Sequence, residues 1–192
     1  MKKKIFLIAV ALICVSILGY GSFAYFTTTD TARNVITSDG LDIEIEEWQQ
    51  TDNGLVAYPK DKPIRVMPTS KVSKIVTVKN LDAESYVRVK LDVTVLDSDD
   101  EEMTVTEEQL KKVIHLQMNG EDWTEKDGWW YYNSSMDAGD VSKPVMTGVE
   151  FDGPNMTNEY QNCTVKIDVT AQAVQVAHNG TDALAALGWP AE

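Results

Sequence analysis

Long stretches in which apolar and polar residues alternate are the feature that most constrains the fold of this chain. Three such stretches begin at Leu41, Val87 and Val165, and the second reads "VRVKLDVTV". Successive side chains of a β-strand point to opposite faces of a sheet, so this period predicts strands with one buried and one solvated face. That character is typical of antiparallel sheets, because strands of parallel sheets are apolar on both faces.

Shorter strands and turns complete the pattern. We expect strands at residues 64–67, 72–78, 114–118, 129–132 and 145–151, and the pairs Asn119-Gly120 and Asp127-Gly128 are tight-turn signals. Many short strands joined by frequent turns indicate a β-sandwich or jelly roll. The predicted fold is therefore mainly β, a single jelly-roll-like antiparallel β-sandwich with one or two short helices.

The two helices are predicted from their capping residues. Thr106 can cap a helix over residues 107–114, with Gln109 completing a capping box. Thr181 and Gly188 are the expected cap and stop of a second helix, in "TDALAALG".

The beginning of the chain has the order of a secretory signal peptide. Three lysines follow Met1, residues 5–18 are uncharged and almost wholly apolar, and small residues follow. Ser22 and Ala24 occupy the two small-residue positions before the cut, which predicts cleavage between Ala24 and Tyr25. The alternative is an uncleaved anchor over residues 5–26, since about 20 apolar residues span a bilayer. The expected divisions are a signal peptide at 1–24, an N-terminal segment at 25–40 and a β-sandwich domain at 41–192.

Charge narrows the list of partners. The chain carries a net charge of −13, and removal of the leader, with three lysines and no acidic residue, lowers this to −16. Such a chain repels phosphate backbones and anionic lipids, so we expect no nucleic-acid partner, and membrane contact only through the uncleaved leader. After cleavage Cys163 is the remaining cysteine, so the domain depends on its hydrophobic core.

Candidate chemistry is scarce. Asp97, Asp99 and Glu101 are weak candidates for a calcium loop, because Glu102 stands where such a loop needs glycine. His115 alternates with apolar neighbours and is expected on the solvated face of a strand, and Cys163 is expected to be buried and inert. We therefore expect no catalytic residues, no cofactor and no enzymatic activity.

Four consecutive aromatic residues stand in "DGWWYYN", residues 127–133. In a strand they divide into two pairs on opposite faces, Trp129 with Tyr131 and Trp130 with Tyr132. We expect one pair in the core and the other on the surface, where it could stack sugars or peptides.

Two stretches resemble a known family. "GSFAYFTTTDTARNVITSDGLDIEIEE", residues 21–47, is similar to the start of the TasA/camelysin family of Gram-positive bacteria. Residues 128–151 and 165–189 resemble clostridial members. The resemblance implies a leader cut by a SipW-like signal peptidase, a jelly-roll-like domain, and export to the cell surface or biofilm matrix. It also implies fibres in which the freed N-terminal segment of one copy completes the sheet of the next.

The N-terminal segment has the composition that this mechanism needs. Residues 25–37 include Phe26, Val35 and Ile36 and five threonines, without proline or glycine, and these are strand formers. Released from the membrane, such a segment can pair with an exposed sheet edge, and head-to-tail insertion builds a filament of copies of the chain. The alternative is that it forms the domain's own first strand or a disordered tail.

Three functions follow as hypotheses. The first is a secreted structural subunit of surface or matrix fibres. The second is a camelysin-like surface metalloprotease, against which stands the lack of a recognisable zinc pair. The third is a monomeric surface binding module that uses the aromatics of residues 129–132.

Overall fold

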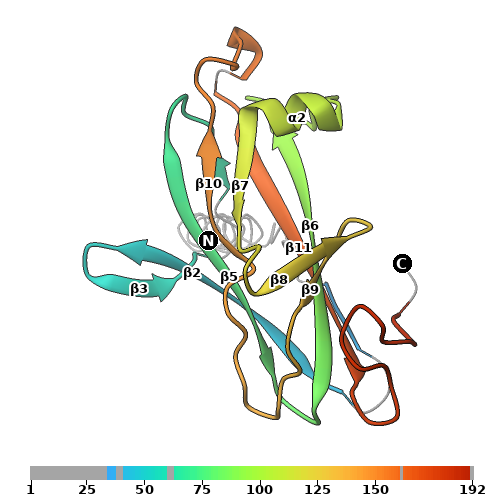
Figure 1. Cartoon of the computed structure of the whole chain (residues 1–192). Coiled ribbons are helices and arrows are strands. Elements are labelled where there is room, and N and C mark those ends of the chain that lie inside the picture. Colours follow the sequence, from blue (N-terminus) through green and yellow to red (C-terminus); the bar gives the residue numbers. More distant parts are fainter. Residues whose placement is uncertain (1–33, 38–40, 60–62, 161, 191–192) are drawn as a thin grey trace, which may run out of the picture. The chain divides into compact units, whose positions relative to one another are not determined.

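The computed structural model describes residues 34–37, 41–59, 63–160 and 162–190. They form two β-sheets packed face to face, with one α-helix and one short 3-10 helix (Figure 1). The first sheet has the order β1-β11-β6-β9-β8, with β4 also paired to β11, and the second has the order β3-β2-β5-β10-β7. The elements are β1 (Asn34–Thr37), β2 (Ile43–Thr51), β3 (Gly54–Ala57), β4 (Ile64–Arg65), β5 (Lys71–Asn80), β6 (Ser85–Leu96), α2 (Glu107–Val113), β7 (Ile114–Met118), β8 (Trp123–Lys126), β9 (Trp129–Tyr132), β10 (Met146–Phe151), η1 (Asn158–Tyr160) and β11 (Thr164–Gln175).

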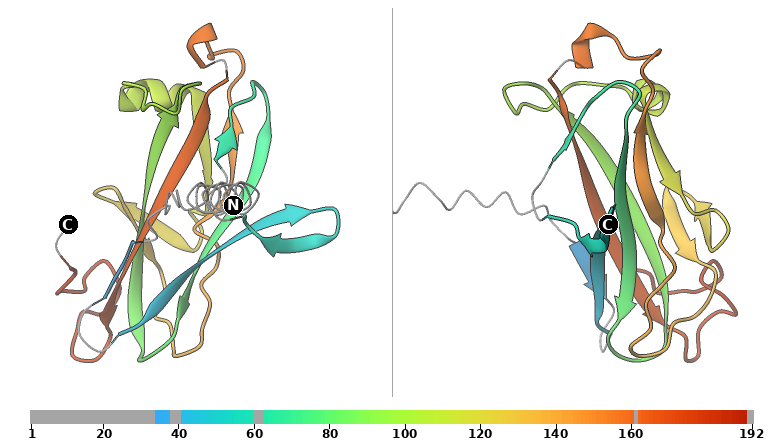
Figure 2. Two further views of the ribbon diagram at one scale, coloured as in Figure 1. Left: turned by 180° about the vertical axis from the view of Figure 1, so that it is seen from behind. Right: turned by 90° about the vertical axis from the view of Figure 1, so that its left-hand side faces the viewer.

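The predicted β-sandwich is confirmed. Every described strand pair is antiparallel except β1 with β11. Among consecutive described strands, only β2 with β3 and β8 with β9 lie in the same sheet, and at every other step the chain passes to the opposite sheet. The longest ladder joins β11 to β6 along the full length of both strands, from Thr164 opposite Leu96 to Gln175 opposite Ser85. Figure 2 shows these two strands running the length of the domain, with the second sheet on one side of them.

The interior is filled by the alternate residues that the sequence pattern singles out. One row of each long strand faces the other sheet and is buried, as the period of two requires. The intervening residues of β6 and β11 lie on the outer face of the first sheet. The inward rows are Val87, Val89 and Val95 of β6, Val165, Ile167, Val169, Ala171 and Ala173 of β11, Ile43 and Ile45 of β2, and Val76 and Val78 of β5.

The first helix and the Asp127-Gly128 turn form as predicted, and Gly120 begins a turn between β7 and β8, which belong to different sheets. The Gln109 amide donates to the Thr106 hydroxyl, and the Gln109 side chain accepts from the Thr106 amide, which closes the capping box. The helix ends at Val113, one residue earlier than expected, because Ile114 already belongs to β7. Asp127 and Gly128 both have positive φ, at 54° and 81°, as a two-residue hairpin turn between β8 and β9 requires.

The predicted second helix at residues 181–188 is wrong, since this stretch is made of turns. The Asp182 carboxylate accepts from the Ala185 amide at 2.9 Å, and the Asn179 side-chain oxygen accepts from the Leu187 amide at 2.7 Å. Side-chain acceptors thus take the amides that a helix would bond to backbone carbonyls. In the part of the chain that the structure describes, no helix is long and apolar enough to cross a membrane.

Candidate assembly site

The outer edge of β11, which faces away from β6, is only partly paired among the residues that the structure describes. β4 pairs with this edge at Thr164 and Val165, and β1 pairs with it from Thr170 to Ala173. Between them, residues 166–169 have no strand partner on this edge among the described residues. A sheet edge of this kind presents backbone N–H and C=O groups that an added strand can satisfy.

β1 lies on this edge in parallel, with Asn34 opposite Thr170 and Thr37 opposite Ala173. The predicted assembly residues Val35 and Ile36 are therefore part of a strand, paired with Ala171 and Gln172 of the same chain. The pairing spans four residues, whereas β11 has twelve. Phe26 and the predicted cleavage position at Ala24 and Tyr25 lie outside the described residues.

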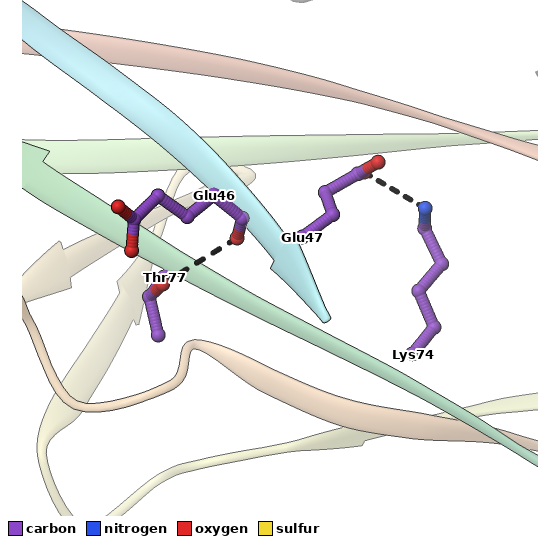
Figure 3. A network of polar contacts seen from close by, with 4 residues as sticks. All are labelled: Glu46, Glu47, Lys74 and Thr77. Carbon is purple, nitrogen blue, oxygen red and sulfur yellow. Dashed lines mark hydrogen bonds and ion pairs between the residues drawn. The ribbon is translucent and has the colours of Figure 1, made fainter. Parts of the chain in front are cut away.

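A buried ion pair lies on the second sheet, where the inward rows of β2 and β5 end. Glu47 continues the row of Ile43 and Ile45, and Lys74 continues that of Val76. The Lys74 ammonium lies 2.8 Å from the Glu47 carboxylate (Figure 3), with side chains 7% and 12% exposed. The interior thus ends in a polar pair on the sheet opposite β11, and β2 contacts β11 across the sandwich.

Tyr58 packs against this pair. The Lys74 ammonium lies 4.1 Å from the centre of its ring, and the Tyr58 amide donates to the Glu47 carbonyl. Burial raises the pKa of the Tyr58 hydroxyl, and the negative charge of Glu47 raises it further. The neutral phenol and the ion pair therefore form one coupled cluster.

On the outer face of the first sheet, Arg88 is held between aromatic rings. Its guanidinium lies 4.1 Å from the centre of the Trp129 ring and 4.7 Å from that of Trp189. Its nitrogens donate to the Gln172 side-chain oxygen at 2.6 and 2.9 Å and to the Tyr131 hydroxyl at 2.9 Å. Arg88 lies opposite Gln172 of β11 and Tyr131 of β9, and Gln172 in turn lies opposite Ile36 of β1. These four positions form one row across the sheet, from β1 to β9.

Residues 176–190, here called the C-terminal cover, lie over this outer face. Ala183 and Ala186 are buried against it, and the Tyr86 hydroxyl donates to the Gly180 carbonyl. The expectation of one exposed aromatic pair is therefore wrong. Trp129 and Tyr131 are buried under the cover, and Trp130 and Tyr132 are half-buried against the main core. Sequence alone missed the cover because Thr181 and Gly188 predict the two ends of a helix in this segment, whereas the structure forms side-chain-capped turns there.

The weak calcium candidates form an ordinary acidic turn after β6. Asp97 accepts from the backbone amides of Asp99 and Glu101 through one carboxylate oxygen, at 2.8 and 3.0 Å. Across the described residues, no group of three or more His, Cys, Asp or Glu side chains is placed to hold a metal ion. His115 is exposed, as predicted, on β7.

Cys163 is buried, as expected. Its sulfur lies 3.4 Å from the Met103 sulfur and 3.3 Å from the Glu159 carbonyl, and burial raises the pKa of the thiol, with a smaller contribution from Asp97. A raised pKa leaves little of the reactive thiolate at neutral pH.

Comparisons with known proteins give little. No model of a protein family matches the chain, and no curated protein matches it. Among solved structures, the chain is similar to the AfaE-3 adhesin from Escherichia coli, with a TM-score of 0.35 and 15% identity, over 71% of this chain and 96% of that one. A similarity at this level defines neither the fold nor the function of the chain.

Proposed function

We propose that this chain is a secreted structural subunit of cell-surface or biofilm-matrix fibres. In this proposal a SipW-like signal peptidase removes the leader, and the freed N-terminal segment pairs with the outer edge of β11 in the next copy. The observation that carries the proposal is the incomplete edge itself: β1 pairs with four residues of a twelve-residue strand, and residues 166–169 have no described strand partner on that edge.

The contact that β1 makes within one chain is also the contact that the fibre needs. An element that pairs in its own chain can make the same contacts in a second copy, as in domain swapping. Parallel pairing is slightly less stable per residue than antiparallel pairing, and the described residues of β1 make four pairs. The internal pairing is therefore a weak competitor for a longer strand from another copy.

A donated segment can pair with more of β11 than β1 does. In the parallel register of β1, residues that precede Asn34 run toward Thr164, along the stretch at residues 166–169. Each added pair satisfies backbone groups that otherwise bond to water, and the hydroxyls and β-branched side chains of the segment favour an extended backbone. One segment then links each copy to the next, a contact that does not close on itself and so elongates.

The proposal assigns no enzymatic activity to the chain. On the outer face of the first sheet, the contacts of Arg88 with aromatic rings hold the C-terminal cover in place. Trp129 and Tyr131 are buried, so the binding-module hypothesis would depend on the half-buried Trp130 and Tyr132.

Truncation tests the proposal. Protein that begins at Tyr25 is expected to form fibres in electron micrographs, and protein that begins at Leu41, which lacks β1, is expected to form no fibres under the same conditions. Near-ultraviolet circular dichroism checks that both forms keep the packed sandwich. Equal elongation of the two would show that the N-terminal segment is not the donor.

A further inference from the structure

The hairpin of β2 and β3 extends beyond the sandwich. Figure 1 shows it as a two-stranded ribbon that leaves the second sheet at the β3 side, and the reverse view in Figure 2 agrees. β3 is the last strand of this sheet, and no described strand pairs with its outer edge. A two-stranded ribbon is marginally stable in water unless further strands or a packed face support it.

The outer edge of β3 lacks the features that protect other edges. β3 reads Gly-Leu-Val-Ala, with Leu55 58% and Val56 40% exposed and no charge. β8, at an edge of the first sheet, carries Glu125 and Lys126, which discourage pairing with another chain. A projecting, uncharged, apolar edge is an interaction surface.

The turn fixes which backbone groups of β3 are available. Thr51 and Gly54 flank a two-residue loop and are opposite each other, so they form the first hydrogen-bonded pair. Hydrogen-bonded and non-hydrogen-bonded pairs alternate along an antiparallel ladder. Val56 therefore bonds to β2, and the N–H and C=O groups of Leu55 and Ala57 point to the open side.

We propose that this edge pairs with the same edge of a second copy, antiparallel about a two-fold axis at Val56. This register places each Leu55 in a hydrogen-bonded pair with Ala57 of the other copy, so all outward groups of both residues are satisfied. Val56 then faces its counterpart as a non-hydrogen-bonded pair, the closer of the two kinds. A shift by one residue would oppose outward to inward groups and is excluded.

A second copy is the occupant that the edge favours, because the outward backbone groups of β3 are complementary to those of another β3 in this register. The chain has a net charge of −13, so two copies repel over most of their surface, but β3 meets β3 without any charge. Because the hairpin projects, the two sandwiches can stay apart while the five-stranded sheets join into one of ten strands. A two-fold contact closes on itself, so it would join two fibres sideways rather than lengthen one.

Disulfide formation tests this pairing in the exported chain that begins at Tyr25. Val56→Cys is expected to give a disulfide-linked dimer on a non-reducing denaturing gel, at least about tenfold faster than Leu187→Cys, because pairing holds the thiols at high effective concentration. Leu187 is the matched control, since it is 78% exposed on the C-terminal cover. Cys163 is buried and does not compete. Equal rates for the two variants would overturn the proposal.

A charge variant gives a second, independent measurement. Val56→Lys would bring two like charges face to face, so lateral pairing of fibres in micrographs, or dimer in sedimentation if fibres do not form, is expected to disappear. Leu187→Lys is expected to pair as the unaltered chain does, and retention of pairing by Val56→Lys would contradict the proposal. Elongation should survive Val56→Lys, and β3 pairing should survive removal of residues 25–40, so the failure of one contact is distinguishable from the failure of the other.

Discussion

The stability of the sandwich is expected to depend strongly on both partners of the buried ion pair of Lys74 and Glu47. Lys74→Met would remove the ammonium that lies against the buried Glu47 carboxylate, and removing one partner of a buried ion pair is expected to cost up to about 3–5 kcal/mol of unfolding free energy. Urea unfolding measures the change. The matched control is Lys111→Met, which breaks the exposed Glu107–Lys111 pair and is expected to leave stability unchanged. Similar losses for both variants would show that burial does not set the cost.

Tyr58 is expected to make the stability of the fold depend on alkaline pH. Its pKa is raised in the folded protein, so above pH 10 the unfolded chain releases this proton before the folded chain does. Stability contributed by the neutral phenol is therefore complete below the ordinary pKa and falls as pH rises above it. Tyr58→Phe is expected to lose less stability between pH 9 and about 11 than the unaltered chain, measured by urea unfolding. An identical loss of stability in both proteins would show that another group, and not Tyr58, causes the pH dependence.

Among the elements, the C-terminal cover depends on one stack. Trp189→Ala removes one face of the Arg88 stack and an edge-to-face contact with Tyr131, 5.6 Å between ring centres. The loss is expected to be about 1–2 kcal/mol. Hydrogen exchange should rise in residues 179–190 and leave the β6–β11 ladder protected. Leu187→Ala, at an exposed position of the same cover, should change neither, and protection of the cover in Trp189→Ala would contradict this account.

The elements also show which features the sequence predicts and which it does not. The alternation of apolar and polar residues predicts β6 and β11 because each has one buried face. The capping box predicts α2 because its two side chains are only three residues apart in the sequence. The position of β1 beside β11 joins residues far apart in the chain, and no local period encodes it. Part of the cover was mistaken for a helix because Thr181 and Gly188 resemble a helix cap and a helix stop, whereas Asn179 and Asp182 bond the backbone into turns.

Of the candidate assembly site, the sequence predicts only the donated strand and not the sheet edge that receives it. The strand-forming composition of residues 25–37 is visible in the sequence, but the edge that receives a strand depends on which strands are neighbours. From the alternating pattern, Arg88 and Gln172 are expected to lie on the solvated face as ordinary polar residues. Trp189 contacts Arg88 through the fold of the cover, which sequence spacing does not specify.

For the whole molecule, the two sheets offer two different edges for contacts between copies. The outer edge of β11 can take a strand from the next copy and so lengthen a fibre, and the outer edge of β3 can pair with itself and so join two fibres. The acidic surface keeps other approaches unfavourable, and its effect weakens with salt. Lateral pairing is therefore expected to increase with ionic strength, measured by the share of paired fibres in micrographs. A decrease would show that attraction between charges drives it.

The most direct test of strand donation uses two variants of the exported chain, each of which adds one cysteine to the buried Cys163. Asn34 and Thr170 are opposite each other in the β1–β11 register, so Asn34→Cys in one chain and Thr170→Cys in another can be linked only between chains. After an equal mixture has assembled and been oxidised, a non-reducing gel is expected to show a dimer with one chain of each kind. Absence of this mixed dimer, while a chain that carries both substitutions forms the same disulfide internally, would contradict strand donation and leave β1 as the domain's own first strand.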